Sequence, residues 1–158
     1  VGVSPVCSIV PFVPDQLDAL QERIGVVFDS RELLSRALTH SSYANEHPPE
    51  RDNESLAFLG DAVLSLVVAE RLWLTAPDDP VGVLTPRRAA LVSGTTLARW
   101  AREIGLPQLL RLGRGEEVMG GSDKESVLAT AFEAVLGLVY LDRGLAGVRA
   151  VVARLAMW

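Results

Sequence analysis

Two carboxylates of this chain lie in apolar surroundings. Asp61 and Glu133 are each flanked on both sides by apolar residues or glycine. A buried carboxylate is costly unless it is paired, hydrogen-bonded or bound to a metal ion. Such groups can hold Mg²⁺, act as general acid and base, or bond a neighbouring helix. We interpret Asp61 and Glu133 as the candidate catalytic and metal-binding residues.

The other polar residues that could take part in chemistry have simpler explanations. Glu54 precedes Asp61 by seven residues, which places both on one face of a helix. Because Glu54 lies near a predicted helix start, where the helix dipole favours an acid, capping explains it as well as function does. His40 could act as a base, but its place near a helix end favours a structural role, and His47 is expected to be solvated. The sequence contains no His/Cys cluster typical of zinc sites.

The elements that position these residues are predicted to be helices. The longest covers roughly residues 53–74 and is apolar on nearly all sides, as expected for a central buried helix. Thr85-Pro86 predicts the start of a helix to Ile104, and Ser122 to Glu125 matches a capping box. Further helices are predicted over 14–24, 30–38, 106–112 and after Gly144. The predicted fold class is all-α, with an N-terminal arm over 1–13 and one domain over 14–158.

Composition limits the class of protein further. The 158 residues are 49% hydrophobic, enough for one domain with a proper core. The formal charge of −5 is unusual for a nucleic-acid binder, although a metal-dependent nuclease carries its own acidic cluster. Cys7 is the only cysteine, which fits a reducing cytoplasm. No apolar run reaches the roughly 18 residues that a membrane span requires.

Four segments of the chain carry a family pattern. Residues 53–64 read NESLAFLGDAVL, and eleven of the twelve positions fit N-E-x-L-E-F-L-G-D-[AS]-[VI]-L. Residues 37–43 read ALTHSSY, residues 112–117 read LGRGEE, and residues 124–142 read KESVLATAFEAVLGLVYLD. In this order, over residues 17–155, these segments resemble the catalytic domain of the ribonuclease III family.

The resemblance implies an all-helical homodimer that cleaves double-stranded RNA with Mg²⁺ in a cleft between the subunits. It implies that the helix of residues 53–64, the signature helix, packs through Phe58 and Leu59 against its copy in a second subunit. Many members carry a double-stranded RNA-binding domain after the catalytic one. Since the chain ends at Trp158, we expect no such domain here.

The chain departs from the family pattern where the chemistry is expected. The family places four metal-binding carboxylates on two helices, and only Asp61 and Glu133 match them. Ala57 occupies the position of a Glu, and Thr130 occupies that of an Asp. Val81 replaces a further acid, whereas Glu54 is retained but is not a core ligand in the family. We therefore expect weak or lost Mg²⁺ binding and little or no nuclease activity.

Three functional hypotheses follow. The first is a non-catalytic relative that keeps the dimer and binds double-stranded RNA without cutting it. The second is an active Mg²⁺-dependent endoribonuclease that takes its missing ligands from Glu50, Asp52, Asp123 or Glu125. The third is a fold recruited to small-molecule acid/base chemistry through Asp61 and Glu133, since a less charged cleft approaches a ligand pocket.

Overall fold

The computed structural model describes residues 14–158, so the predicted arm over 1–13 lies outside the described residues. The described residues form helices and turns without a β-strand, apart from one isolated bridge between Thr39 and Arg111. The elements in order are α1 (Pro14–Ile24), α2 (Arg31–Ala37), α3 (Ser41–Glu46), α4 (Glu54–Thr75), α5 (Val81–Leu91), α6 (Gly94–Glu103), η1 (Leu106–Gln108), α7 (Arg114–Val118), η2 (Gly121–Asp123) and α8 (Glu125–Ala156). The all-α prediction is confirmed.

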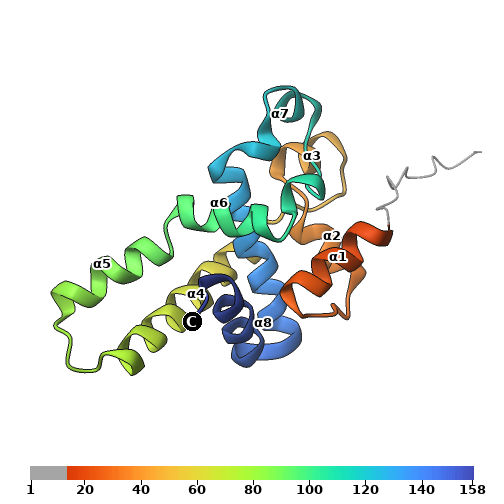
Figure 1. Cartoon of the computed structure of the whole chain (residues 1–158). Coiled ribbons are helices and arrows are strands. Elements are labelled where there is room, and N and C mark those ends of the chain that lie inside the picture. Colours follow the sequence, from red (N-terminus) through yellow and green to blue (C-terminus); the bar gives the residue numbers. More distant parts are fainter. Residues whose placement is uncertain (1–13) are drawn as a thin grey trace, which may run out of the picture.

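The centre of the molecule is the packing of α4 against α8, with α6 against the other side of α8 (Figure 1). Leu64, Val68, Phe132 and Leu136 are completely buried between these helices and their neighbours. Trp100 of α6 is equally buried and contacts Phe132, with a ring-centroid distance of 5.7 Å. The central position explains the apolar residues on one side of α4, whereas Phe58, Leu66 and Trp73 on its other side are exposed in the single chain.

The C-terminal part of α4 and the helix α5 project from this body as an arm (Figure 1). No residue of α5 is buried, and α5 packs on α4 with little contact to α6. The predicted helix start at Thr85-Pro86 was wrong, because α5 begins at Val81 and Pro86 lies inside it. The single helix predicted up to Ile104 is two helices, because the Ser93 side chain caps a new one. Its Oγ accepts a hydrogen bond from Thr96 N at 3.3 Å.

The remaining helix boundaries follow local chemistry. Ser30 caps α2, its Oγ accepting a hydrogen bond from Leu33 N at 3.1 Å. The capping box predicted from Ser122 was wrong, because α8 starts at Glu125 without a side-chain cap and the preceding residues form η2. The predicted break at Gly144 is present inside α8, where φ is +63°.

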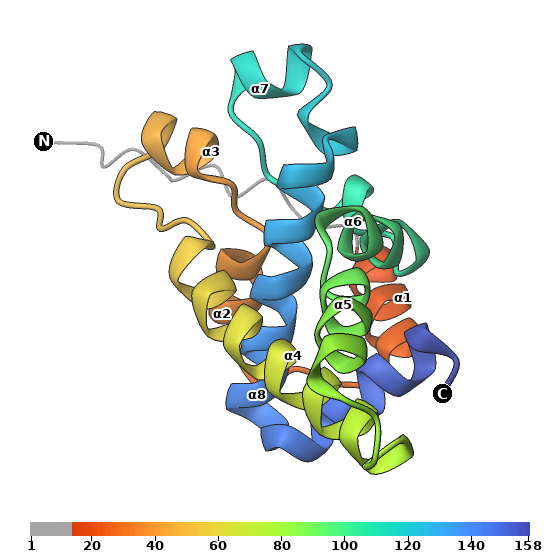
Figure 2. The ribbon, with the colours of Figure 1, turned by 90° about the vertical axis from the view of Figure 1, so that its left-hand side faces the viewer.

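One end of the molecule is formed by α3 and α7, which lie close together (Figure 2). The Thr39–Arg111 bridge joins the segments that precede them: His40 N donates to Arg111 O at 3.0 Å, and Arg111 N donates to Leu38 O at 2.8 Å. The segment 37–43 is thus bonded to Arg111, which directly precedes the segment 112–117, and Gly113 N donates to Ser42 Oγ at 2.9 Å. None of the helices in residues 14–158 combines the length and apolarity needed to cross a bilayer.

Candidate active site

The candidate site lies where α4 and α8 cross, and two glycines make this crossing very close. A Cβ atom at Gly60 would collide with the carbonyl oxygen of Glu133, and one at Gly137 would collide with that of Leu56. The two main chains therefore touch directly, as glycine alone permits. Asp61, which follows Gly60, and Glu133 are brought to the same place by this contact.

The electrostatics of Asp61 and Glu133 reflect this proximity. Burial raises the pKa of Glu133 to about 7, and the negative charge of Asp61 acts in the same direction. Asp61 itself is exposed and Glu133 is partly buried. Within residues 14–158 neither carboxylate accepts a side-chain hydrogen bond or joins an ion pair. The Glu133 carboxyl consequently holds its proton to a higher pH than an ordinary glutamate does.

The positions one helical turn earlier supply no charge. Ala57 precedes Asp61 by four residues and is 6% exposed, while Thr130 precedes Glu133 by three residues and is partly buried. Alanine offers no ligand atom and threonine offers only a neutral hydroxyl. Among residues 14–158, no group of three or more His, Cys, Asp or Glu side chains is placed to hold a metal ion.

These residues do not fit the acidic cluster that the family's chemistry requires. Mg²⁺ prefers hard, charged oxygen ligands in a near-octahedral arrangement. The crossing offers only two carboxylates, and burial raises the pKa of one of them, Glu133, to about 7. A two-metal arrangement, which needs carboxylates on both sides of the reacting phosphate, has no adequate donor set here.

Three of the four acids suggested as replacement ligands, all except Asp123, are engaged elsewhere. Glu50 forms an ion pair with Arg111 at 3.1 Å, and Asp52 accepts a hydrogen bond from Glu54 N at 3.1 Å. Glu125 accepts a hydrogen bond from Thr95 Oγ1 at 3.2 Å. The hypothesis of re-sourced ligands therefore finds no support in the geometry.

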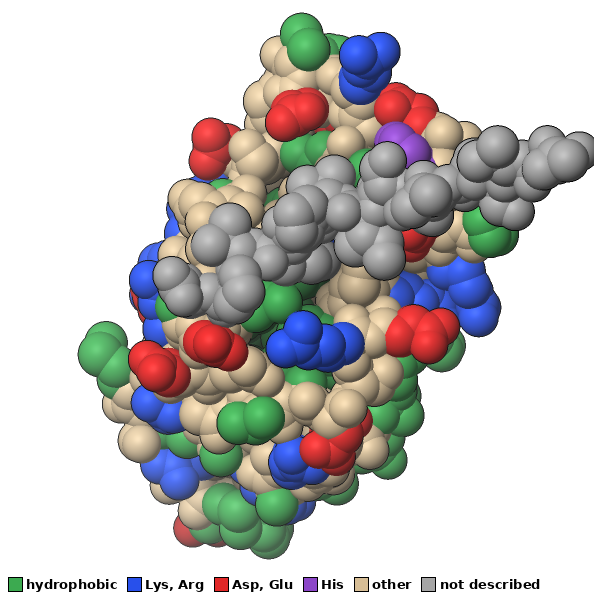
Figure 3. Space-filling view, turned by 90° about the vertical axis from the view of Figure 1, so that its right-hand side faces the viewer, with side chains coloured by type: hydrophobic (Ala, Val, Ile, Leu, Met, Phe, Trp, Pro, Cys, Tyr) green, Lys and Arg blue, Asp and Glu red, His purple; other side chains and the backbone are tan. Residues whose placement is uncertain are grey.

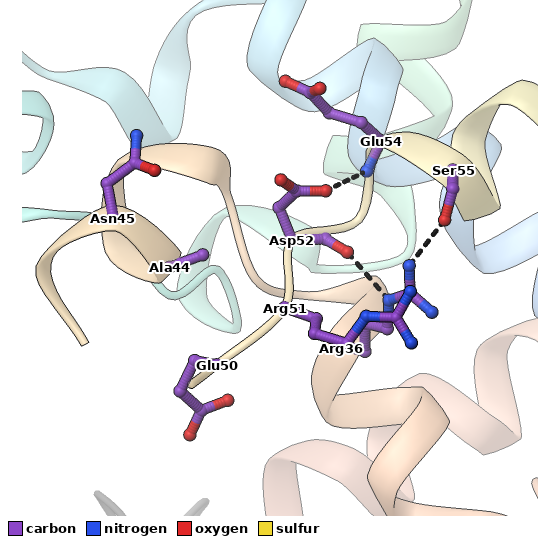
Figure 4. Close-up of a pocket in the computed structure, with 8 residues that line it drawn as sticks. All are labelled: Arg36, Ala44, Asn45, Glu50, Arg51, Asp52, Glu54 and Ser55. Atoms are coloured by element: carbon purple, nitrogen blue, oxygen red, sulfur yellow. Dashed lines mark hydrogen bonds between the residues drawn. The ribbon is translucent and has the colours of Figure 1, made fainter. Parts of the chain in front are cut away.

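Glu54, Asp52 and Glu50 instead line an open cavity of about 470 Å³ between α3 and the start of α4. In Figure 4 the side chains of Glu54 and Glu50 point in opposite directions. Arg36 donates to the Asp52 carbonyl oxygen at 2.9 Å and to Ser55 Oγ at 2.5 Å, which fastens α2 to the start of α4. Glu54 is exposed at the first position of α4, consistent with the capping interpretation.

Other sequence interpretations can now be compared with the structure. His40 caps α3, accepting a hydrogen bond from Ser42 N at 3.2 Å, so its structural role is confirmed. Val81 is the first residue of α5 and is 77% exposed on the arm. Arg111 has contacts that its place in the sequence did not predict: it binds Glu50 and lies 4.3 Å from the centre of the Tyr43 ring. Its signal was a single charge within an apolar run of leucines.

Four arginines on α5 and α6, two on each helix, could contact phosphate groups. Arg87 pairs with Asp79 at 2.5 Å, and Arg99 pairs with Glu103 at 3.6 Å. Arg102 donates to the Asp123 carbonyl oxygen at 2.9 Å, whereas Arg88 has no carboxylate partner in the described residues. Figure 3 shows acidic and basic side chains interspersed over the visible part of the face that carries α1, so that part offers no basic patch.

Comparisons with known proteins agree on the fold. A family model described as Ribonuclease-III-like matches residues 30–157. A relative named Ribonuclease 3 from Thermobifida fusca (strain YX) is 51% identical over 132 residues, which cover 84% of this chain and 55% of the relative. Ribonuclease 3 of Oceanobacillus iheyensis is 48% identical over 127 residues, covering 79% of this chain and 56% of that protein. The chain spans about half the length of these curated relatives.

Solved structures give the same result. The nuclease domain of ribonuclease III from Campylobacter jejuni superposes with a TM-score of 0.82 at 36% identity, covering 88% of this chain and 94% of that one. Its description concerns structural flexibility in a region involved in dimer formation. Dicer from Pichia stipitis matches with a TM-score of 0.61 at 25% identity, covering 83% of this chain and 55% of that one.

Proposed function

Because the chain belongs to the ribonuclease-III-like family, we propose that it is a dimeric, double-stranded-RNA-binding protein with little or no nuclease activity of its own. One observation carries this proposal: Ala57 and Thr130 occupy the turns beside Asp61 and Glu133 at the crossing of α4 and α8. The fold is retained there and half of the expected charge is missing. The proposed location is the cytoplasm, which rests on the single cysteine of the sequence.

The loss of nuclease activity is argued from electrostatics. Metal-assisted phosphodiester hydrolysis requires cations that activate a water and stabilise the leaving oxygen. The family is Mg²⁺-dependent, but removing two negative ligands weakens the attraction for a dication, since each ligand contributes a Coulomb energy that grows as the surroundings become less polar. The remaining pair, Asp61 and Glu133, has no further acid within the described residues to complete a cluster.

The proposed dimer rests on an apolar strip along α4. Phe58 is 80% exposed, Leu66 is 53% exposed and Trp73 is 56% exposed in the single chain. With Ala62 and Ala69 these residues fall within an arc of about 80° on the helix. An exposed apolar strip of this kind is typical of an interaction surface. Two copies of one strip can pack against each other around a two-fold axis.

Sedimentation velocity at micromolar concentration tests the dimer. The Phe58→Asp variant should sediment as a monomer, because a charge would be buried at the strip. Val118→Asp is the matched control, since Val118 is 88% exposed on α7, away from this strip. A monomeric unmodified protein would reject the dimer proposal.

A cleavage assay tests the central proposal. Long double-stranded RNA is incubated with the unmodified protein and Mg²⁺, and little or no product is expected. The Ala57→Glu/Thr130→Asp variant restores two carboxylates and should recover cleavage if only the ligands were lost. Efficient Mg²⁺-dependent turnover by the unmodified protein would overturn the proposal. Failure of the restored variant would indicate that the cleft itself has changed.

The acid/base hypothesis has one observation in its favour, the pKa of about 7 at Glu133, which suits proton transfer near neutral pH. However, Asp61 and Glu133 line neither the cavity between α3 and the start of α4 nor the one between Val67, Arg149 and Trp158. Small-molecule sites are normally enclosed pockets that bury most of the ligand. The hypothesis therefore ranks behind RNA binding.

A further inference from the structure

A cavity separate from the α4/α8 crossing lies between the C-terminal half of α4 and the end of the chain, which runs beside α4 there (Figure 1). Its volume is about 380 Å³, and it is lined by four apolar and three charged side chains. Pockets that bind small molecules have volumes of about 300 to 1,000 Å³ and combine an apolar lining with a few polar groups. The size and lining of this cavity therefore suit a ligand with one ring system.

The apolar part of the cavity is suited to a flat ring. Val67 is 2% exposed and belongs to the core, so it forms an apolar base, whereas Leu74 is 63% exposed and lies towards the solvent. The partly buried indole of Trp158 forms an aromatic wall. A planar aromatic ligand would gain free energy both from burial of its apolar surface and from contact with the indole ring.

The charged part of the cavity contains one cation without a carboxylate partner. Glu70 accepts two hydrogen bonds from Arg149, of 2.6 and 2.8 Å, so these two opposite charges offset each other. Arg71 forms no ion pair within residues 14–158, and its guanidinium carbon lies 5.7 Å from the centre of the Trp158 ring. A guanidinium can bind a carboxylate or a phosphate through two parallel hydrogen bonds. Arg71 is therefore placed to bind an anionic group beside the aromatic wall.

The acids near this cavity along the chain do not cancel the charge of Arg71 within it. Asp78 and Asp79 follow the end of α4 and do not line the cavity, and Asp79 is paired with Arg87. The three charged side chains that do line it have a net charge of +1, from two arginines and one glutamate. The lining therefore favours an anion over a cation.

The cavity also lies on a different face of α4 from the apolar strip proposed for dimerisation. The α4 residues that line it are centred about 130° around the helix from that strip. Neither Asp61 nor Glu133 lines it. A ligand in this cavity would therefore compete neither with the proposed dimer nor with the crossing.

We propose that this cavity is a binding site for a small aromatic anion, whose ring packs against Trp158 and whose carboxylate or phosphate group is bound by Arg71. A nucleoside monophosphate and an aromatic carboxylate share this chemistry. The inference does not depend on RNA binding, on cleavage or on the dimer, because none of the residues that line the cavity belongs to those proposals.

The test is an NMR titration that follows the indole N–H signals of the three tryptophans, with Trp158→Phe identifying the signal of Trp158. The anionic probes are adenosine monophosphate and naphthoate, and their neutral counterparts are adenosine and naphthamide. An anionic probe should shift the Trp158 signal and saturate it at about millimolar concentration. Its neutral counterpart should bind about tenfold more weakly, because it makes no charged contact with Arg71.

Two arginine variants test the role of the free cation. Arg71→Gln should weaken binding of the anionic probe about tenfold, to the level of the neutral one. Arg88→Gln is the matched control, since Arg88 is also an exposed arginine without a carboxylate partner in the described residues but does not line the cavity. It should bind the anionic probe as the unmodified protein does.

Three outcomes would overturn the inference. The first is that neither anionic probe shifts the Trp158 signal at millimolar concentration. The second is equal binding of the neutral counterparts, which would show that the cavity does not select an anion. The third is an equal loss of affinity in the two arginine variants, which would show a general effect of surface charge. Binding of only one anionic probe would support the inference and identify the anionic group as phosphate or carboxylate.

Discussion

The α3/α7 end of the molecule and the α4/α8 crossing treat charged side chains in opposite ways. At the α3/α7 end, Arg111 is bound by Glu50, stacks on Tyr43 and donates to Ser35 Oγ at 2.8 Å. Nearby, Lys124 donates to Glu116 at 2.6 Å, which joins α7 to the start of α8. At the crossing, Asp61 and Glu133 lie close to each other without a cation partner among the described residues.

The difference separates charges that have partners within the chain from like charges that have none among the described residues. A partly buried charge that stabilises a structure must have its partners within the same chain. A catalytic cluster is instead a group of like charges whose partners arrive from outside. Half of the charges in such a cluster can be lost without loss of the fold, because no structural contact depends on them. We expect perturbations of the two regions to differ accordingly.

The largest effect is expected at the glycine contact of the crossing. Gly60→Ala would drive a methyl group into the Glu133 carbonyl, and overpacking of this kind should cost about 3 kcal/mol of the free energy of unfolding. Gly82→Ala is the control, since a Cβ there meets open space, and it should be neutral or slightly stabilising. Urea denaturation measures both. A stable Gly60→Ala variant would contradict the direct contact of the main chains.

A smaller loss is expected at the α3/α7 end. The Arg111 side chain is 12% exposed, and its removal leaves Glu50 unpaired. Arg111→Met should therefore cost about 2 kcal/mol of the free energy of unfolding. Arg87→Met, at an exposed pair with Asp79, should cost less than about 1 kcal/mol. Thermal unfolding of the two variants sharpens the comparison. Equal losses would show that Arg111 is no more structural than a surface arginine.

The smallest effect should depend on pH and arise at Glu133. The Glu133 carboxyl has a pKa of about 7 in the folded protein, against 4.5 for an ordinary glutamate. Between pH 4.5 and about pH 7 the folded state therefore binds more protons than the unfolded state. Stability from this group is therefore lost as the pH rises from about 4.5 to about 7. Glu133→Gln should be as stable as the unmodified protein at acid pH and about 1–2 kcal/mol more stable in alkaline buffer, after allowance for partial exposure.

Denaturation in EDTA across this pH range measures the difference. Asp61→Asn is a useful second variant, because it removes the charge that is the second cause of the raised pKa of Glu133. In this variant the pH range over which stability is lost should be narrower. A stability difference between Glu133→Gln and the unmodified protein that does not vary with pH would contradict the coupling of the two carboxylates.

The central part of the fold was predictable because its signals are local and repeated. The helix predicted over 53–74 is observed as Glu54–Thr75, and Asp61 and Glu133 meet at the crossing as the family pattern implies. The periodic apolar pattern sets such helices, and the glycines in both segments permit their contact. The dimer, the loss of activity and the RNA contact stay predictions.

The parts that were not predicted depend on contacts between residues distant in sequence, or on helix-start signals of which only one is used. Thr85-Pro86 looks like a helix start, but the chain is already helical from Val81, and Pro86 in the interior is tolerated on the exposed arm. The partnership of Arg111 with Glu50 spans 61 residues, and helical periodicity carries no information about such pairs. Neither residue belongs to an element with a strong pattern.

The break at Gly144 sets a limit on how far this domain can be trimmed. Beyond it the chain turns back and places Val148, Val151 and Val152 in the interior, where none is more than 1% exposed. Deleting this terminal segment would remove all three valines and expose to water the core residues that they cover. A minimal autonomous version must therefore extend past Val152, whatever is removed from its other end.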